Sequence, residues 1–332
     1  MDTLFSDALR DLLADQCTPQ VVRAIESQPQ NRPLWDALES SGFADAMLSE
    51  SQGGAGLGLT EAFHLFAMCG GHCVPVPLGE TMWARALLGQ HQVSLPQGSI
   101  TWASGQRRPQ GELHADTVRM GQVADHAIVT DGTQAWLLAT ASAAKSAAGF
   151  PLDASLTWPG AALAQALPLP FVPDVRTLQA CLYAAQLSGA LMAVFERTLQ
   201  YANDRQQFGR PIGKFQAIQH HLSVMSEHAF AARMAAQLGC QSATVNPDPL
   251  RVAVAKARTS EAALEVAALG HAIHGAIGFT AEFDLQLLTR RLHVWRQAAG
   301  SESYWHTVLG QALLDRPQAQ VLELIREVSD VH

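Results

Sequence analysis

The sequence has no excess of basic residues and no long hydrophobic run. These two absences argue against a nucleic-acid-binding protein and against a membrane-spanning protein. Its 332 residues include 22 Lys and Arg against 30 Asp and Glu, which gives a net charge of −8. Non-specific binding of DNA or RNA needs a basic face, so we expect no nucleic-acid partner. A local basic pocket for a phosphorylated ligand is still compatible with this charge. No run of about 18 apolar residues is present, so we expect no membrane-spanning segment and no membrane partner.

Cysteine is scarce as well, with five residues at scattered positions. An odd number without regular spacing favours a reducing compartment over a disulfide framework. The N-terminal stretch MDTLFSDALRDLLADQ is acidic and amphipathic, unlike a signal or transit peptide, and this predicts a cytoplasmic protein. The stretch CGGHC at 69–73 has no second pair of ligands nearby. We therefore favour a tight turn with buried thiols there and expect no metal site.

What the sequence does contain is a large apolar fraction, 48% hydrophobic against 16% charged residues, which indicates a globular chain of two or three domains. Residues 1–97 have helical periodicity, and GGAGLG at 53–58 is interpreted as a turn because its spacing does not fit a nucleotide-binding loop. Residues 98–172 contain short β-rich segments separated by Gly and Asp-Gly turns. Residues 173–332 contain four long amphipathic helices. We predict a mostly helical α+β protein with an N-terminal helical domain, a small middle β domain and a C-terminal four-helix bundle.

Three stretches have characteristic motifs. YANDRQQFGRPIGKFQAIQHH at 201–221 places Arg205 three residues before Phe208, breaks at Pro211 and then begins a helix. HGAIGFTAEFDLQLLTRR follows at 274–291, and LWDALESSGFADAMLSESQGGAGLGLTEA lies at 34–62. Together these stretches resemble the acyl-CoA dehydrogenase family, and the resemblance covers nearly the whole chain. The predicted order of helices, β domain and bundle is similar to that family's layout.

The resemblance implies FAD as cofactor and an acyl-CoA as substrate. In the family, the arginine matched by Arg205 reaches across a subunit interface to the FAD pyrophosphate, where a guanidinium makes a forked contact that lysine matches poorly. The alternative for Arg205 is a surface salt bridge with Asp204 or another acid. The HGAIG turn matches one that lies near the ADP portion. The residues assigned to cofactor binding by the resemblance are Arg205, Gln207, Phe208, Ile212, Phe215, Gly275, Ala276 and Ser301.

The chain departs from the family where the chemistry is performed. The catalytic carboxylate of most members corresponds to Ala299, in WRQAAGSES at 295–303, and the position used by other members corresponds to Gln179. Neither residue can act as a base, and Glu302 is a weaker candidate because helical spacing turns it away. The family's T-E-P-x-x-G-S-D and W-I-T segments are also missing, since the matching regions read SITWASGQRRPQG and DTVRMGQVADHAIV. We expect no catalytic residue among the family positions.

These losses favour a subunit that completes the FAD site of a second acyl-CoA dehydrogenase subunit in an α2β2 heterotetramer. By analogy with bacterial heteromers, its substrate would be a bulky CoA ester such as a steroid side chain, with electron-transfer flavoprotein as acceptor. Two alternatives remain open: a self-sufficient homo-oligomer with a non-standard base, and a non-enzymatic scaffold. We expect His220 and His221 at solvent or interface positions. We expect Lys256 and the pair Arg290-Arg291 to be surface or interface charges.

Overall fold

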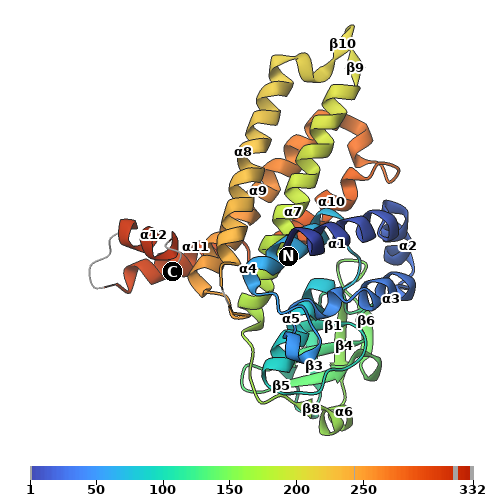
Figure 1. Ribbon diagram of the computed structural model, residues 1–332, viewed down its shortest axis with the longest axis vertical. Coiled ribbons are helices and arrows are strands. Elements are labelled where there is room, and N and C mark those ends of the chain that lie inside the picture. The colour runs from blue at the N-terminus through green and yellow to red at the C-terminus, as the bar shows by residue number, and fades with distance from the viewer. Residues whose placement is uncertain (1, 243, 317–320, 330–332) are drawn as a thin grey trace. The chain divides into compact units, whose positions relative to one another are not determined.

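The computed structural model describes residues 2–242, 244–316 and 321–329, and for residues 2–4 only the backbone (Figure 1). The chain forms two compact units. The first comprises residues 1–65, 74–179 and 243–245, and the second comprises residues 66–73, 180–242 and 246–332. Each unit is described by itself. The order of helices, then short strands, then long helices is the order that the sequence predicts.

The first unit begins with short helices whose starts are set by local chemistry. Thr18 caps the second helix by accepting a hydrogen bond from the Val21 N–H at 3.4 Å, and Pro19 occupies its first turn. The helix from Leu78 to Gln90 is buried on every side, which explains why it shows little helical periodicity. The helices are α1 (Asp2–Gln16), α2 (Pro19–Ser27), α3 (Arg32–Ser40), η1 (Phe43–Asp45), η2 (Glu50–Gln52), α4 (Leu59–Gly71) and α5 (Leu78–Gln90).

Two four-stranded sheets follow, with a shared apolar core that includes Trp136 and Trp158. One sheet has the order β1-β4-β5-β8 and the other the order β2-β3-β7-β6. The predicted Asp-Gly turn joins β4 to β5: Gly132 has φ +89°, and the Asp131 carboxylate accepts from the Thr133 and Gln134 N–H groups. The elements are β1 (Ile100–Ser104), β2 (Gln106–Arg107), β3 (Leu113–Val118), β4 (His126–Thr130), β5 (Ala135–Ala139), η3 (Thr140–Ser142), β6 (Ala144–Ala147), β7 (Ala154–Trp158), α6 (Gly160–Gln165) and β8 (Leu167–Pro168).

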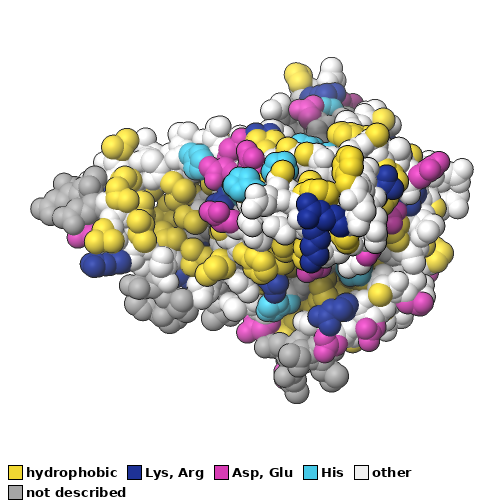
Figure 2. Space-filling model, turned by 90° about the horizontal axis from the view of Figure 1, so that it is seen from above, with side chains coloured by type: hydrophobic (Ala, Val, Ile, Leu, Met, Phe, Trp, Pro, Cys, Tyr) yellow, Lys and Arg dark blue, Asp and Glu magenta, His cyan; other side chains and the backbone are white. Residues whose placement is uncertain are grey.

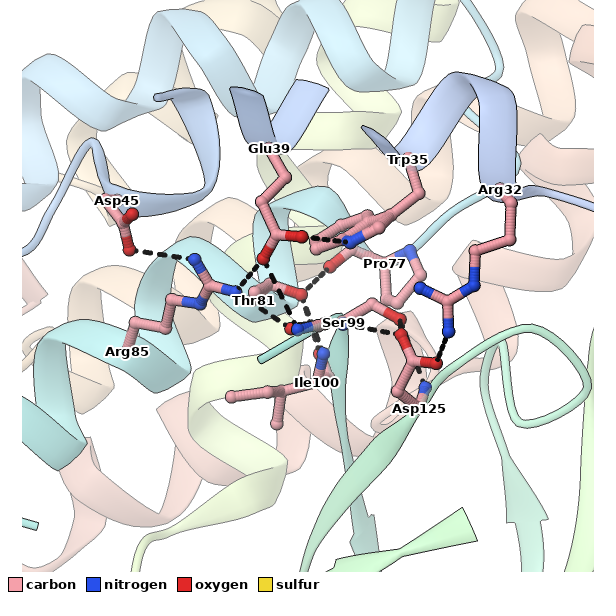
Figure 3. Close-up of polar contacts among 11 residues, drawn as sticks. Arg32, Trp35, Glu39, Asp45, Pro77, Thr81, Arg85, Ser99, Ile100 and Asp125 are labelled. Carbon is pink, nitrogen blue, oxygen red and sulfur yellow. Dashed lines mark hydrogen bonds and ion pairs between the residues drawn. The ribbon is translucent and has the colours of Figure 1, made fainter. Parts of the chain in front are cut away.

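A buried polar network joins these helices to the start of β1 (Figure 3). Arg85 on α5 pairs with Glu39 and with Asp45 (2.9 Å), and it donates to the Gly98 carbonyl at 2.9 Å. Ser99 bonds the Asp125 carboxylate through both its N–H and its hydroxyl. A buried guanidinium is costly unless its donors are used, so this network ties helices and strands into one unit. The predicted boundaries at 97/98 and 172/173 remain a prediction.

The second unit is built on long helices, of which α7, α8 and α9 run side by side in Figure 1. Asp248 caps α9 by accepting from the Leu250 and Arg251 N–H groups at 2.9 and 2.8 Å. Gly270 lets α9 approach α7 closely, because an added Cβ would lie 3.2 Å from Val194. The elements are α7 (Val175–Asp204), β9 (Gln206–Gln207), β10 (Arg210–Pro211), η4 (Ile212–Lys214), α8 (Gln216–Gly239), α9 (Pro249–His274), η5 (Gly275–Phe279), α10 (Leu285–Gln297), α11 (Glu302–Leu314) and α12 (Val321–Ser329).

Two stretches of the chain, Val175–Asp204 and Pro249–Phe279, are long and apolar enough to cross a membrane by length and composition alone. In the first, 72% of the most apolar window is buried within the chain. Core helices of a bundle pass the same test, so this is weak support for a membrane span.

Candidate cofactor site

The helix α7 ends in a two-stranded ribbon that the sequence shows only as a break at Pro211. Gln207 in β9 pairs with Arg210 in β10, and the Ile212 N–H returns to the Arg205 carbonyl at 2.8 Å. The two residues at the tip, Phe208 and Gly209, both have left-handed backbones, with φ +51° and +79°. This is the backbone that a two-residue hairpin turn requires. The ribbon projects from one end of the bundle (Figure 1).

Phe208 at this tip is 91% exposed. A bulky residue with positive φ is rare and costs on the order of 1 kcal/mol, and leaving the ring in water forgoes about 2 kcal/mol that burial would supply. Phe215 packs edge to face with it at 6.2 Å and is itself covered by the Arg210 guanidinium at 4.2 Å. An exposed aromatic side chain held in a strained backbone indicates a contact with another molecule.

Positive charge surrounds this tip. Arg205, Arg210 and Lys214 lie within ten residues of one another and all three are exposed. Among the described residues the Arg205 guanidinium makes no ion pair, and the neighbouring Asp204 carboxylate accepts instead from the Gln200 amide at 2.8 Å. Figure 2 views the molecule from this end and shows Lys and Arg side chains near the middle of the face. This donor set suits phosphate oxygens, so the alternative of a simple salt bridge with Asp204 is not supported.

The second motif reaches the same end of the bundle, although it lies some seventy residues later. The Tyr201 ring stacks on His274 with centroids 4.3 Å apart, and the Tyr201 hydroxyl donates to the His274 carbonyl at 3.5 Å. His274 is followed by η5, in which Gly275 (φ +66°) and Ala276 are exposed. The structure therefore brings the Arg205 ribbon and the η5 turn together. Two other assigned residues, Ile212 and Phe215, are buried and half-buried beneath the ribbon.

Two histidines, His271 and His274, lie in the last turn of α9, directly before η5. The sequence motif alone did not reveal their contacts. The Nδ1–H of His274 donates to the Gly270 carbonyl at 2.8 Å, and His271 Nε2 lies 2.9 Å from the Thr289 hydroxyl. The remaining nitrogen of each ring is buried without a hydrogen-bond partner. His271 also stacks on Phe279 at 4.2 Å. Burial lowers the pKa of both imidazoles, so both are neutral at pH 7. His220 is exposed and His221 is half-exposed, as expected.

Ser301, the last residue assigned to the cofactor, belongs to a different region of this unit. It is the N-cap of α11 and closes a turn whose Gly300 carbonyl accepts from Lys256 at 2.8 Å. Lys256 precedes His274 by eighteen positions on α9, so it lies roughly 27 Å away along the helix axis. Within one chain, Ser301 is therefore not brought to the Arg205 and Gly275 group.

The structure gives neither family base position a titratable group. Ala299 lies in the turn before α11, and its carbonyl accepts from the Trp305 indole at 3.1 Å. The Gln179 amide donates to the Trp102 carbonyl at 3.1 Å. Glu302 forms an ion pair with Arg296. Burial alone would raise the pKa of Glu302, but bonds from its own backbone and from Arg296 hold that pKa below its ordinary value. Its carboxylate is thus ionised and already engaged.

One expectation from the sequence is wrong: neither Lys256 nor Arg291 is a surface charge. Lys256 is fully buried and Arg291 is 1% exposed, while Arg290 is half-buried. The reason is that α9 packs against α8, α10 and α11, and α10 packs against α9 in turn. Arg291 donates to the Leu287 carbonyl of its own helix at 3.2 Å. Periodicity did not reveal this, since alanines cover most faces of α9.

Comparisons with known proteins identify the same family that the motifs suggest. The acyl-CoA dehydrogenase C-terminal domain family matches residues 178–314. Acyl-CoA dehydrogenase IpdE2 of Mycobacterium tuberculosis (strain ATCC 25618 / H37Rv) is 31% identical over 293 residues, which cover 87% of this chain and 90% of the relative. IpdE2 of Mycolicibacterium smegmatis is also 31% identical, covering 90% of this chain and 94% of the relative.

Two solved structures confirm the predicted fold class. The ChsE4-ChsE5 complex from Mycobacterium tuberculosis contains a chain that superimposes with a TM-score of 0.79 at 22% identity, covering 96% of this chain and 98% of that one. A Tcur3481-Tcur3483 steroid ACAD variant gives a TM-score of 0.81 at 24% identity, covering 95% and 98%. At these identities the likeness concerns the fold alone.

Proposed function

We propose, from the premise that this chain belongs to the acyl-CoA dehydrogenase family, that it is a subunit which completes the FAD site of a partner subunit. The family is FAD-dependent. The observation that carries the proposal is the exposed ribbon: Phe208 at its tip is 91% exposed in a strained backbone, and Arg205 beside it is exposed and makes no ion pair with any residue that the structure describes. A second subunit that holds FAD would supply the missing contact.

The residues at the ribbon fit the ADP half of FAD. Arg205 offers a forked pair of donors to a pyrophosphate, and a lysine and a second arginine add positive charge. The η5 turn offers exposed backbone around Gly275, where a close approach by a ligand meets no side chain. Phe208 provides an apolar face beside these donors. FAD held by these residues would supply the acceptor for a hydride from the β-carbon of an acyl thioester.

The residues at the two family base positions do not fit a catalytic subunit. Proton abstraction from the α-carbon needs a carboxylate within hydrogen-bond reach. Ala299 has no such group, and the Gln179 amide has no basic lone pair. Glu302 is held by Arg296. We therefore infer that the base belongs to a different subunit, in an α2β2 complex with a complete acyl-CoA dehydrogenase.

The comparisons support a heteromer and a bulky substrate. Solved structures with this fold include the ChsE4-ChsE5 complex and a Tcur3481-Tcur3483 steroid ACAD. By analogy we propose an acyl-CoA with a steroid-derived acyl group as substrate and electron-transfer flavoprotein as acceptor. The proposed substrate and the proposed acceptor rest on analogy between proteins of the same fold, and not on the geometry of this chain.

Two other functions predict different behaviour. A self-sufficient homo-oligomer with a non-standard base should hold one FAD per chain when expressed alone and should bleach with some acyl-CoA. A scaffold should hold no FAD under any condition. The retained Arg205 and Phe208 disfavour the scaffold, because a forked phosphate donor beside an apolar ring suits a cofactor such as FAD.

Activity of the purified chain tests the proposal. We expect negligible acyl-CoA oxidation with an artificial electron acceptor when the chain is alone, and turnover when it is co-expressed with a catalytically complete paralogue. The control is the paralogue by itself, which should be less active than the mixed complex. Robust turnover by the single chain would sink the proposal and favour the homo-oligomer.

A further inference from the structure

Two of the five cysteines meet in the second unit, although they lie far apart in the sequence. The sulfur atoms of Cys181 on α7 and Cys240, the C-cap of α8, are 3.6 Å apart, and both side chains are fully buried. The Cys181 thiol also donates to the Gly239 carbonyl at 3.4 Å. That carbonyl is the last of α8 and has no acceptor role within the helix. The thiol therefore contributes to the cap of α8.

The two sulfur atoms are close enough for a covalent bond to form with little movement of the chain. A disulfide brings its sulfur atoms to about 2.05 Å, so Cys181 and Cys240 need to approach by roughly 1.5 Å. Cys240 can supply this movement, because the end of a helix frays more readily than its interior. Cys181 lies in the second turn of α7, within the body of a long helix. The contact is thus suited to closure from the side of α8.

A bond at this place would join the open ends of a helical hairpin. The helices α7 and α8 run side by side, and the ribbon that carries Arg205 connects them at one end (Figure 1). Cys181 follows the start of α7 and Cys240 follows the end of α8, so the pair lies at the other end. The two cysteines are 59 positions apart, and closing a long loop restricts the unfolded chain. A disulfide would therefore stabilise the hairpin without a contact at the ribbon.

We propose that Cys181 and Cys240 are a site of reversible modification, where a hydroperoxide converts the two thiols into a disulfide that fastens α7 to the end of α8. With hydrogen peroxide, the Cys240 thiolate attacks one oxygen and the O–O bond breaks. This gives a sulfenic acid, and the released hydroxide takes the proton of the first thiol and leaves as water. The Cys181 thiolate then attacks the sulfenic sulfur, so the S–S bond forms, the S–O bond breaks and a second water leaves with the other proton. The two sulfur atoms lose two electrons, which the peroxide gains.

The closed bundle protects the pair, so the reaction requires the last turn of α8 to open. Burial, and then the neighbouring Cys240, raises the pKa of the Cys181 thiol well above its usual range, and the thiolate is the reactive form. Arg251 on α9 holds the segment that follows α8, because it donates to the Gln241 carbonyl at 3.0 Å. Opening at this end exposes Cys240 before Cys181, which is the reason for assigning the first attack to Cys240.

The first test treats the purified chain with hydrogen peroxide and maps its peptides by mass spectrometry. We expect the peptides of Cys181 and Cys240 to appear as one species, lighter than their sum by two hydrogens, and dithiothreitol to separate them. The oxidised chain should melt roughly 5 °C or more above the reduced chain. Cys181→Ala and Cys240→Ala should each abolish both effects. The matched control is Cys17→Ala, which removes a buried cysteine of the first unit and should retain both.

The second test concerns the opening of α8. Arg251→Met removes the donor to the Gln241 carbonyl and keeps an unbranched apolar stem, so we expect disulfide formation to become about tenfold faster or more, as the loss of a charged hydrogen bond allows. The matched control is Arg233→Met, at an exposed arginine of α8, which should leave the rate unchanged. If Arg251→Met does not fold, urea below the unfolding transition opens the same helix end, and it should accelerate disulfide formation in the wild-type chain.

Three results would overturn the proposal. Cysteines 181 and 240 that stay unlinked after peroxide treatment, reduced or oxidised singly, would make their contact ordinary core packing. A bond from either one to a different cysteine would assign the oxidation to another site. A disulfide that leaves the melting temperature unchanged would mean that the native hairpin does not accommodate the link. None of these results bears on the cofactor, because flavin retention in Arg205→Ala tests the proposed function separately.

Discussion

At the scale of single residues, the proposed function assigns to this chain the flavin contacts made across a subunit interface, and to its partner the contacts made within one subunit. The side chains for the interface are present and solvent-exposed at the ribbon, in Arg205 and Phe208. The group needed for proton abstraction is absent at Ala299 and Gln179. In the proposed function, the chain binds the far end of a cofactor and its partner supplies the catalytic base.

The contribution of Arg205 can be measured directly. A charge-assisted contact with phosphate contributes roughly 1.5–3 kcal/mol, so Arg205→Ala should weaken FAD retention in the complex about ten- to a hundredfold. Arg205→Lys should recover only part, because an ammonium cannot make the forked contact. The measurement is flavin absorbance per assembled complex after gel filtration. The fold should hardly change, since the residue is exposed.

Arg233→Ala is the matched control for that experiment. Arg233 is an exposed arginine on α8, away from the ribbon in sequence and on the same unit. Its removal changes the net charge by the same amount, so any general electrostatic effect on flavin would appear in both variants. Equal flavin content in wild type and Arg205→Ala would mean that Arg205 does not touch the cofactor.

At the scale of elements, the long helices were the easiest part to predict. Apolar positions recur every three or four residues along α7 and α8, and Pro249 with Asp248 marks the start of α9. The ribbon of β9 and β10 was not predicted, because two-residue strands leave no alternation to detect. Its turn is formed by Phe208, a residue that local propensity would not place at positive φ. Lys256 was misjudged although α9 has a polar side, formed by Arg258, Glu261 and Glu265, because Lys256 lies on the buried side of the helix.

The η5 turn should lose stability in acid because of the histidines beneath it. Their pKa values are lowered from the ordinary 6.5, first by burial. The unfolded chain therefore binds protons more readily than the folded chain as the pH falls below about 6.5, and the free energy of unfolding decreases there. Above that pH both states are neutral at these rings and no change is expected. Thermal midpoints at pH 8 and pH 5.5 measure the effect.

The double variant His271→Gln with His274→Gln should reduce this pH dependence, because a glutamine amide does not titrate. His220→Gln is the control, since that ring is exposed. His293 on α10 acts electrostatically on His271, and Arg197 on α7 pairs with Asp284 at 3.7 Å; these side chains stay unchanged in both variants. An equally steep decline in the double variant would assign the acid sensitivity to other groups.

At the scale of the whole molecule, the second unit exposes a group of large apolar side chains to solvent. Six large side chains on α8, α11 and α12 are between 51% and 73% exposed: Phe230, Met234, Leu314, Val321, Leu322 and Ile325. Hydrophobic side chains gather on the side of the molecule where α11 and α12 lie (Figures 1 and 2). Exposed apolar patches mark interaction sites, and obligate interfaces resemble a divided core. The exposed ribbon and this surface both support the proposed assembly.

We expect the purified chain to elute as a dimer or larger species, and co-expression with a complete paralogue to give a mixed complex that carries FAD. Ile325→Lys on α12 should weaken assembly, because a charge buried at an apolar interface is costly unless paired. The matched control is Gln311→Lys, an exposed polar position on α11. Light scattering coupled to gel filtration gives the mass of each species. A stable monomer at micromolar concentration, with and without the paralogue, would contradict assembly through this unit and leave the Arg205 ribbon without the neighbour it requires.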